Sequence, residues 1–483
     1  MTPLIIGSEG VLGVVTSATL RMHPIPQTRA FCAFSFSSVE AGWEAMQRMF
    51  QQGLRPAVAR LYDVFDSFIA RLGSVRRGKH TKTGPKEHSG EGAGLGARVL
   101  RRVLRQPAVL NRLVDAAPSE LLGGATLILM FEGLAGQGEA DLERARKISL
   151  AAHAKDLGEA PARHWFSHRY SVSYRQSPVF MAGAFSDTME VAAPWSRLAE
   201  LYRAVRAALG KNVFVMAHLS HAYPDGCSIY FTFAGSAATP RDMEALYDST
   251  WRNAMDAAIS SGGTLSHHHG VGRSKAPRLG AELGAGVDVI HSLRRVLDPR
   301  GIMNPGNLLP RDPPERRPVT PAPATPVLDK ASLLVHVSGS SLLSQVESAL
   351  ANAGLSLRVD PSRVDLAKTT VDAWIAAGAP GAPDPWADPA DHLLAGFTAR
   401  LRSGVEIEIR PSPRRAVGPD LFALFFGMGG RVGEIRSAHL RAHSTNTDHR
   451  ARPFEVKLDR DPPLLPTEAA WIDRIASAAA LTG

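Results

Sequence analysis

The 483-residue sequence is poor in cysteine: it has only Cys32 and Cys227. Two cysteines cannot make a disulfide framework, and a reducing compartment is therefore predicted. No apolar run reaches the roughly 18–20 residues that a membrane-spanning helix needs. The first residues do not show a charged stretch followed by an apolar stretch and a cleavage site, so no signal peptide is predicted. We expect a soluble, cytoplasmic protein.

A strong excess of one charge is also missing. The 55 Lys and Arg residues against 46 Asp and Glu residues give a net charge of +9, which is modest for this length. The composition therefore does not favour a nucleic-acid partner. Hydrophobic residues make up 44% of the chain, which excludes a wholly disordered protein. At roughly 150 residues per domain, the length allows about three domains.

Strand-like and helix-like segments alternate between residues 28 and 260. Alternating or continuous apolar residues predict strands over 28–36, 57–63, 125–132, 213–219 and 227–234. Apolar residues at helical spacing predict helices over 39–52, 139–155, 195–209 and 240–260, the last one capped by Thr239. This pattern predicts an α+β domain that has one sheet with helices on one of its faces.

The turn sequence Tyr223-Pro-Asp-Gly226 separates two of the predicted strands. In a two-residue hairpin, Tyr230 would face Leu219 and share a face of the sheet with His221. A tyrosine and a histidine so placed can relay a proton. The alternative is a tyrosine that packs on the sheet with its hydroxyl group satisfied.

Two segments interrupt this pattern. Residues 73–118 form a basic insertion, mobile at its Gly-, Lys- and His-rich start and amphipathic over 98–114. We consider two hypotheses for 98–114, a solvated helix or a contact with an anionic membrane, and Pro107 breaks this helix. Seven prolines between 310 and 326 predict a stiff linker over 310–330 and a domain boundary.

An internal repeat connects the two ends of the chain. Residues 4–23, LIIGSEGVLGVVTSATLRMH, align without a gap on residues 424–443, LFFGMGGRVGEIRSAHLRAH. We interpret the opening segment as the end of a strand, a glycine turn and a second strand, with the part before it absent. The C-terminal region then carries a second, altered copy of the same element.

Three adjacent histidines, His267, His268 and His269, are unusual inside a chain. On an extended segment the first and third face one way and the second faces the other, and no further Cys or His has zinc-site spacing. No metal is therefore predicted. A catalytic or substrate-facing cluster fits better, because imidazole is the usual proton carrier near neutral pH.

The glycine turn allows two interpretations as well. Gly7-Ser-Glu-Gly10 followed by Gly13 would let backbone amides approach a ligand closely. A tight turn without any ligand explains the same residues.

Six motifs occur in an order that resembles the alkyldihydroxyacetonephosphate (alkylglycerone-phosphate) synthases, FAD enzymes of the vanillyl-alcohol-oxidase superfamily. The resemblance covers about residues 1–310, and the string Ser-His-His-His-Gly-Val-Gly is its most specific part. The motifs are GSEGVLGV at 7–14, RLYD at 60–63, APW at 193–195, IYF at 229–231, GGTLSHHHGVG at 262–272 and DPRGIMNPGN at 298–307.

This resemblance implies non-covalently bound FAD and a lipid-like substrate. The implied reaction replaces a fatty acyl group on dihydroxyacetone phosphate with a fatty alcohol, a step of ether lipid synthesis. It implies catalytic roles for Tyr230, His267, His268 and His269, and substrate-binding roles for Arg60 and Arg175. The implied cofactor-binding residues are Gly7, Ser8, Glu9, Gly10, Gly13, Val14 and Asn304.

The resemblance also implies a domain order. Residues 1–24 would end a PCMH-type FAD-binding domain, 25–309 would form the FAD-linked oxidase C-terminal (cap) domain, and 331–445 a degenerate second PCMH-like half-module, followed by a tail over 446–483. In the superfamily a pyrophosphate-binding subdomain precedes the first glycine turn, and neither copy here has its glycine-rich loop. Weak FAD binding by this chain alone is therefore implied. A truncated gene, a separate chain that carries this subdomain, or a degenerate non-catalytic relative would each explain it.

Three functions stay open on the sequence. The first is an alkylglycerone-phosphate-synthase-like enzyme, cytoplasmic and in contact with a membrane through 98–114. The second is an FAD-linked 2-hydroxy-acid dehydrogenase or oxidase, which would share the glycine turn and Asn304-Pro-Gly306. The third is a non-catalytic subunit or a degenerate relative.

Overall fold

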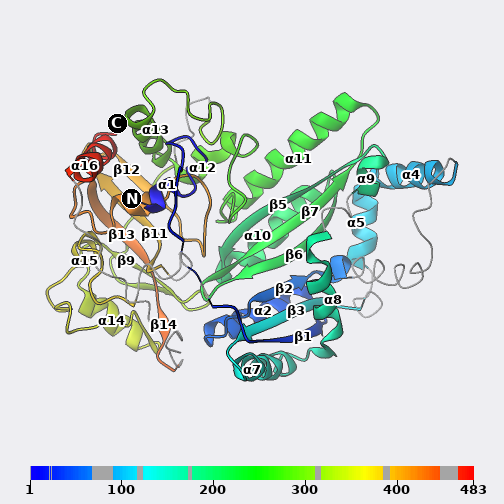
Figure 1. The fold of residues 1–483 in the computed structure, drawn as a ribbon, viewed down its shortest axis with the longest axis horizontal. Coiled ribbons are helices and arrows are strands. Elements are labelled where there is room, and N and C mark those ends of the chain that lie inside the picture. Colours follow the sequence, from blue (N-terminus) through cyan, green and yellow to red (C-terminus); the bar gives the residue numbers. More distant parts are fainter. Residues whose placement is uncertain are drawn as a thin grey trace.

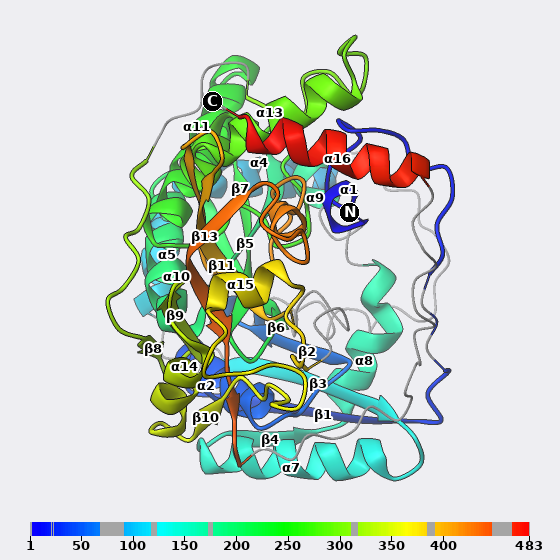
Figure 2. The same ribbon diagram turned by 90° about the vertical axis from the view of Figure 1, so that its left-hand side faces the viewer.

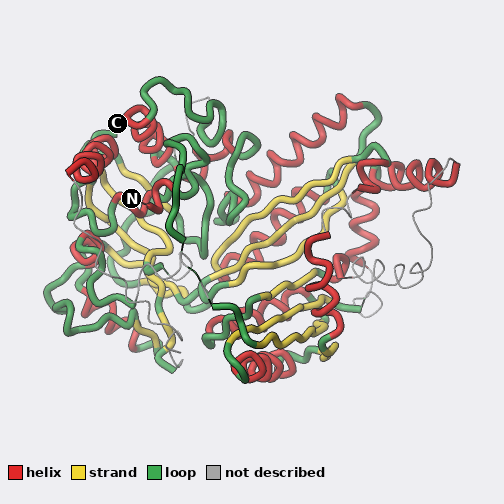
Figure 3. Tube along the Cα trace, in the orientation of Figure 1, coloured by secondary structure: helices red, strands yellow, loops and turns green. Residues whose placement is uncertain are grey.

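The computed structural model describes residues 2–20, 22, 24–67, 91–116, 123–171, 177–310, 317–383, 392–446 and 466–482. Two antiparallel sheets stand beside each other, the larger on the right in Figure 1 and the smaller on the left. Helices cover both sheets, and long loops join the two halves (Figure 3). The α+β class predicted from the sequence is therefore confirmed.

The larger sheet has seven strands in the order β4-β1-β3-β2-β6-β7-β5. Every described pairing within it is antiparallel. Its strands are β1 (Thr28–Phe36), β2 (Val58–Tyr62), β3 (Ala125–Gly133), β4 (Lys155–Gly158), β5 (Phe185–Pro194), β6 (Phe214–Ala222) and β7 (Gly226–Gly235).

Helices pack on both faces of this sheet, so the prediction of a single covered face is wrong. Alternate residues of β1 explain why: Cys32 and Phe34 are buried in the main core, whereas Phe31 and Ala33 are buried in a second cluster on the opposite side of the strand. The second cluster includes residues of α8 (Ala160–His168). The strand is thus apolar on both faces, as expected for a strand covered on both sides.

The remaining elements of the first half are helices. The main ones are α2 (Val39–Gln51), α4 (Glu91–Leu104), α5 (Pro107–Ala116), α7 (Gln137–Ala151), α9 (Ser177–Met181), α10 (Trp195–Gly210), α11 (Pro240–Ser260), α12 (Leu279–Leu283) and α13 (Gly286–Leu297), with short turns η1 (Arg169–Ser171) and η3 (Ala276–Arg278). Pro107 separates α4 from α5, as the sequence predicted. Among the described helices, none combines the length and the apolar content needed to cross a membrane.

The smaller sheet has the strand order β12-β11-β13-β9-β8 and is also antiparallel. Its strands are β8 (Val327–Asp329), β9 (Leu334–Ser338), β11 (Leu394–Leu401), β12 (Glu406–Ile409) and β13 (Gly433–Arg441), and a separate ladder joins β10 (Leu355–Ser356) to β14 (His443–Ser444). Around it lie α14 (Leu343–Ala351), α15 (Val371–Ala376), η4 (Leu421–Leu424) and α16 (Pro466–Ala480). The predicted C-terminal tail therefore contains a helix, and α16 packs on α13.

The predicted strand-turn-strand at the N-terminus is wrong. The residues before the glycine turn form a short helix, α1 (Thr2–Ile5), which packs against η4 of the second copy. No described residue from 13 to 26 lies in a helix or strand. The apolar alternation was present in the sequence, but a strand also needs a neighbour to complete its hydrogen bonds.

A buried ion pair joins the two halves. Asp225, in the turn between β6 and β7, accepts a hydrogen bond of 3.0 Å from Nε of Arg441 at the end of β13. Asp225 is 1% exposed and Arg441 is 7% exposed. The other guanidinium nitrogens donate to the backbone carbonyls of His392, Leu394, Ser412 and Pro413.

We predict that Arg441→Met destabilises the protein strongly, because it leaves a buried carboxylate without its cation. Loss of one partner of a buried pair lowers the free energy of unfolding by about 3–5 kcal/mol. The matched control is Arg436→Met, on the same strand, whose guanidinium pairs with Glu434 in solvent. This control should cost less than about 1 kcal/mol. Denaturant unfolding measures both, and equal losses would contradict the assigned role of Arg441.

Candidate active site

Three neighbouring strands place a histidine, a tyrosine and a glutamate in one row. Tyr230 on β7 stands opposite Glu190 on β5 and opposite His218 on β6. The sequence predicted that Tyr230 would face Leu219, which is wrong by one residue. The register of β6 shifts between Leu219 and Ala222, and such an irregularity changes which residues face each other.

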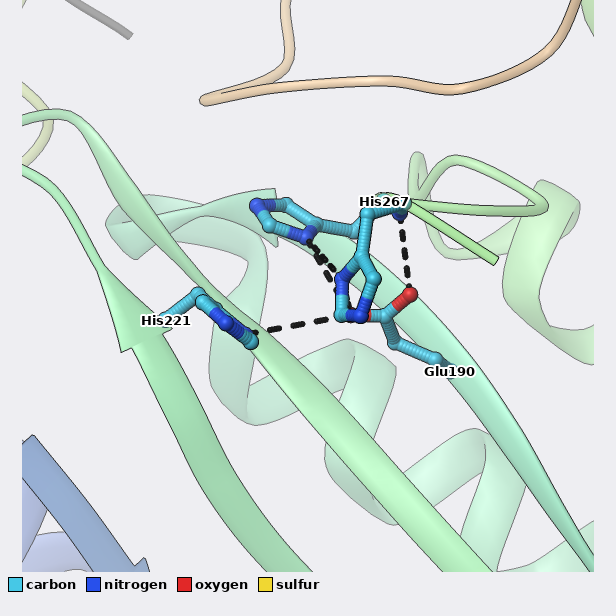
Figure 4. Close-up of side chains that lie close together, drawn as sticks. Glu190, His221 and His267 are labelled. Atoms are coloured by element: carbon cyan, nitrogen blue, oxygen red, sulfur yellow. Dashed lines mark hydrogen bonds and ion pairs between the residues drawn. The ribbon is translucent and has the colours of Figure 1, made fainter. Parts of the chain in front are cut away.

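Glu190 is fully buried and is the centre of a hydrogen-bond network (Figure 4). Its Oε1 lies 3.1 Å from Nδ1 of His267 and 2.7 Å from Nδ1 of His268. Its Oε2 accepts the backbone N–H groups of His268 and His269 at 3.0 and 3.3 Å. Burial alone would raise the pKa of Glu190, but the hydrogen bonds from His267 and His268 outweigh burial and hold this pKa well below its usual range.

The histidine segment does not run as an extended strand, so its side chains do not alternate as predicted. Both His267 and His268 turn toward Glu190, whereas His269 approaches it only through its backbone. Bends over residues 267–269 make this arrangement possible.

A chain of hydrogen bonds runs from Tyr230 through His268 to Glu190. The Tyr230 hydroxyl lies 3.2 Å from Nε2 of His268, whose Nδ1 faces the carboxylate. An ionised carboxylate only accepts, so His268 Nδ1 donates to it and Nε2 can accept from Tyr230. Burial, together with the charge of Glu190, raises the pKa of Tyr230. The tyrosine therefore holds its proton next to a base that can take it.

Two further side chains complete the network. The Tyr223 hydroxyl lies 2.7 Å from Nε2 of His267. The His221 ring stacks on the His267 ring with 5.0 Å between centroids. Burial lowers the pKa of His267, and burial with the neighbouring His267 and His268 lowers that of His221 to about 3.

Arg60 lies one step away from this network. Its Nη2 donates to Nε2 of His218 at 2.6 Å, and Nδ1 of His218 donates to Asp66 at 3.2 Å. The His218 ring stacks on Tyr230, with centroids 4.8 Å apart and an interplanar angle of 11°. Burial and the Arg60 charge lower the pKa of His218, in agreement with a neutral ring. Arg60, which was predicted to bind substrate, thus contacts His218 in the row of His218, Tyr230 and Glu190, and not the histidine triplet.

The glycine turn is fastened to the same loop. Glu9 has a left-handed backbone with φ of 51°, and its carboxylate accepts the N–H groups of Val271 at 2.6 Å and Gly272 at 2.8 Å. Asn304 donates from Nδ2 to the Glu9 carbonyl. Hydrogen bonds therefore connect the glycine turn to the histidine loop and to Asn304.

Lys275, three residues after Gly272, is a buried cation. It is 5% exposed, and its Nζ has no hydrogen-bond partner among the described residues. Burial lowers its pKa to about 8, although the carboxylates of Glu190, Glu282 and Glu9 favour its charged form. An anionic or hydrogen-bond-accepting ligand would satisfy this ammonium group.

Four side chains also offer ligand atoms for a metal ion. Among the described residues, one oxygen of Glu190 and one ring nitrogen each of His221, His267 and His268 lie within 4.8 Å of one another. No metal was predicted from the sequence because adjacent histidines were expected to diverge, and that premise is wrong. The Glu190 carboxylate already accepts from both rings in the triplet, so hydrogen bonds alone account for the arrangement.

The structure thus assembles most, but not all, of the predicted residues. Arg175 lies outside the described residues, and Val14 is 75% exposed and belongs to the irregular segment. Sequence reasoning missed Glu190, although one signal was available. It is the single acid within the apolar stretch Met189-Glu-Val-Ala-Ala193, where a buried carboxylate needs a specific partner.

Comparison with known proteins places this site in a family. The family model of FAD linked oxidases, C-terminal domain, matches residues 25–308. The chain belongs to the FAD-linked oxidase family. This confirms the superfamily predicted from the motifs.

Individual relatives are similar to this chain over part of their length. The alkyldihydroxyacetonephosphate synthase of Trypanosoma brucei brucei is 26% identical over 325 residues, which cover 65% of this chain and 49% of the relative. That of Dictyostelium discoideum is 25% identical over 317 residues, 64% of this chain and 48% of the relative. A solved structure of an alkyldihydroxyacetonephosphate synthase is 22% identical with a TM-score of 0.42, and the match covers 62% of this chain and 48% of that one. The chain thus spans about half the length of the curated relatives it matches.

We predict that the stability of this protein falls as the pH is lowered from about 6.5, the ordinary histidine pKa. In the folded state the pKa of His221 is about 3. Below pH 6.5 the unfolded chain therefore binds protons that the folded chain does not, and unfolding becomes easier as the pH falls toward 3. Denaturant midpoints between pH 7.5 and 4.5 measure this slope.

The variant His221→Gln should reduce the slope, and the exposed His153→Asn should leave it unchanged. Some slope will remain in His221→Gln, because burial also lowers the pKa of His392 to about 4. Equal slopes in the wild type and His221→Gln would contradict the prediction.

Proposed function

We propose that this chain is the catalytic part of an alkyldihydroxyacetonephosphate-synthase-like enzyme, which exchanges a fatty acyl group on dihydroxyacetone phosphate for a fatty alcohol. The observation that carries the proposal is the hydrogen-bonded series Tyr230–His268–Glu190, in which His268 of the Ser-His-His-His-Gly-Val-Gly loop joins Tyr230 of β7 to Glu190 of β5. The names of the relatives support the same substrate class.

Enzymes of this family use FAD, and the described residues fit this cofactor only in part. Lys275 Nζ and the hydroxyl of Ser266 are buried and without hydrogen-bond partners in the described structure, so they suit a polar group placed next to the histidine loop. The second glycine turn does not suit a pyrophosphate. Its amides at Gly427 and Gly429 already donate to the carbonyls of Ile375 and Ala376.

The proton chemistry follows from the residues of this chain. Tyr230 keeps its proton because its pKa is raised, and it can deliver that proton to a substrate oxygen. It can receive a proton from a substrate carbon only after its own proton has passed to His268. His268 exchanges the proton with the tyrosine through Nε2. Glu190 stabilises the imidazolium that forms, because it accepts from the other ring nitrogen.

Arginine and lysine would hold the phosphate of the substrate. The Nε of Arg60 is buried and has no partner among the described residues, so the guanidinium retains a donor. Guanidinium groups suit phosphate because they offer paired N–H donors. Lys275 adds a second buried cation near the histidines.

We predict that Tyr230→Phe reduces turnover by at least about 100-fold, as loss of a general acid–base group does. The measurement follows a labelled long-chain alcohol as it replaces the acyl group of palmitoyl-dihydroxyacetone phosphate. The enzyme is supplied with FAD and with any flavin-bearing chain that purifies with it. Tyr247→Phe is the matched control, because its hydroxyl donates to Asp187, away from the histidine loop.

Three results would oppose the proposal. Unchanged turnover in Tyr230→Phe would remove the role of the tyrosine. Dye reduction with glycolate or lactate, without alcohol exchange, would assign the chain to 2-hydroxy-acid oxidation. A flavin-loaded wild type that is inactive in both assays would indicate a non-catalytic protein.

We further propose that the basic insertion contacts an anionic membrane. The helices α4, α5 and α9 pack on one another at the far end of the larger sheet (Figure 1). Arg98, Arg102 and Arg112 are exposed on α4 and α5. The exposed apolar side chains of the three helices are Val99, Val103, Val109, Leu113, Phe180 and Met181. Exposed apolar side chains with arginines are typical of helices that lie on anionic lipid.

We predict that the protein sediments with vesicles of phosphatidylcholine and phosphatidylserine and not with phosphatidylcholine alone. The double variant Val99→Asp, Val103→Asp should lower the bound fraction several-fold, because it adds negative charge to the contact. Val327→Asp is the control, at a valine that is 55% exposed on β8. Equal binding to both vesicle types would contradict the proposal.

A further inference from the structure

A loop of the smaller half contacts the histidine site. It consists of residues 412–416, between β12 and η4, and is called the bridging loop below. Figure 2 shows the arrangement that makes this contact possible: the smaller sheet, with β11 and β13 in orange, stands in front of β5 and β7 of the larger sheet, in green. The smaller half therefore lies next to the strands that carry Glu190 and Tyr230.

Two contacts hold the bridging loop on the larger half. The N–H of Ala416 donates to the carbonyl of Ser266 at 2.9 Å, directly before the histidine triplet. Pro413 packs on the turn between β6 and β7, where a Cβ on Gly226 would lie only 2.9 Å from the Pro413 Cγ. Arg414 stands between these two contacts in the sequence. Its backbone is therefore held between the turn and the histidine loop.

The buried guanidinium of Arg441 holds the same loop. Its Nη2 donates to the carbonyls of Ser412 and Pro413 at 2.9 and 3.0 Å, while its Nε donates to Asp225. Ser412 in turn donates from Oγ to the Arg414 carbonyl at 2.8 Å. The backbone at Arg414 is thus fixed relative to β6 and β7 without the help of its own side chain.

The side chain of Arg414 is free, in contrast to that of its neighbour. Arg415 donates from Nη2 to the carbonyls of Ala395 and Arg410. Arg414 is exposed, and within the described part of the chain its guanidinium forms neither a hydrogen bond nor an ion pair. A free guanidinium offers paired N–H donors to an anionic ligand, and a fixed backbone has little freedom to lose when the ligand binds.

This guanidinium lies close enough to the histidines for its charge to act on them. Burial is the main cause of the lowered pKa of His221 and of His267, and the charge of Arg414 contributes in both cases. The side chains of His221 and His268 are 41% and 37% exposed, so the site is open to solvent. A ligand that enters at these rings therefore meets a positive charge that the smaller half supplies.

We infer that Arg414 is a substrate-binding residue, which holds phosphate or carboxylate oxygens of the ligand in the histidine site. The identity of the ligand rests on the proposed function. In that reaction the phosphate of acyl-dihydroxyacetone phosphate and the carboxylate of the departing fatty acid are both anionic oxygen groups, and guanidinium suits either one. The inference makes the smaller half a part of the active site.

The first test measures anion binding to the full chain by calorimetry, with dihydroxyacetone phosphate and octanoate as separate probes. Arg414→Gln should weaken the binding of at least one probe by about 10- to 100-fold, as expected when a hydrogen bond to a charged group is lost. Arg414→Lys should recover only part of this affinity, because lysine keeps the charge but not the paired donors. Weaker binding of dihydroxyacetone phosphate would identify phosphate as the group that is held, and weaker binding of octanoate would identify carboxylate.

Arg402→Gln is the matched control. It removes an exposed positive charge of the smaller half just beyond the end of β11, whereas the bridging loop is hydrogen-bonded near the start of that strand. The control should bind both probes as the wild type does. Unchanged affinities in Arg414→Gln, an equal loss in Arg402→Gln, or a wild type that binds neither probe would overturn the inference. A lower unfolding temperature of Arg414→Gln would indicate a structural role and would overturn it as well.

The exchange assay separates this inference from the proposed function. Arg414→Gln should raise KM more than it lowers kcat, because Arg414 binds the ligand and exchanges no proton. Tyr230→Phe should keep the wild-type affinity for both probes while turnover is lost. A wild type without exchange activity, whose anion binding depends on Arg414, would refute the proposed function and leave the inference standing. Exchange activity whose KM and probe affinities do not change in Arg414→Gln would refute the inference alone.

Discussion

The site depends on one constraint: the partly buried loop from Leu265 to Gly272 lies outside any sheet or helix, so the acceptors for its N–H groups come from elsewhere. Three carboxylates supply the missing acceptors. Glu282 of α12 accepts from the Leu265 N–H and from the Thr264 hydroxyl, Glu190 of β5 from the N–H groups of His268 and His269, and Glu9 of the glycine turn from those of Val271 and Gly272. A buried N–H group without a partner is energetically costly, so these hydrogen bonds fix the position of each carboxylate. They also fix the backbone of the loop and with it the orientation of the histidine rings.

This arrangement couples parts of the chain that are far apart in sequence. Glu9 precedes all strands of the larger sheet in the sequence, and Glu282 follows them. The loop between β12 and η4 adds a further hydrogen bond, from the N–H of Ala416 to the carbonyl of Ser266. The buried pair of Arg441 and Asp225 then fixes the smaller sheet next to the turn between β6 and β7. The histidine loop is therefore held by contacts from three separate parts of the chain, which suits proton transfer between side chains at fixed distances.

Much of the fold could be predicted from local patterns. The helix that begins after Thr239 and the strands over 28–36 and 125–132 follow from capping and from apolar periodicity, which depend on neighbouring residues only. The residue opposite Tyr230 could not be predicted, because a shift of register in β6 decides which residue of β6 pairs with it. The strand expected after Gly13 also failed, since alternation states a preference and pairing requires a partner.

The sequence by itself determined the family, the class of fold and the identity of the histidine loop, because these are carried by residue types at fixed spacing along the chain. Only the tertiary structure decided which side chains meet at this loop. It brought Glu190 to His268 and Tyr230 across neighbouring strands, placed Arg60 on His218 instead of on the triplet, and left residues 13–20 outside the described sheets. These are contacts between segments distant in sequence, and strand order and register set them, which no local pattern records.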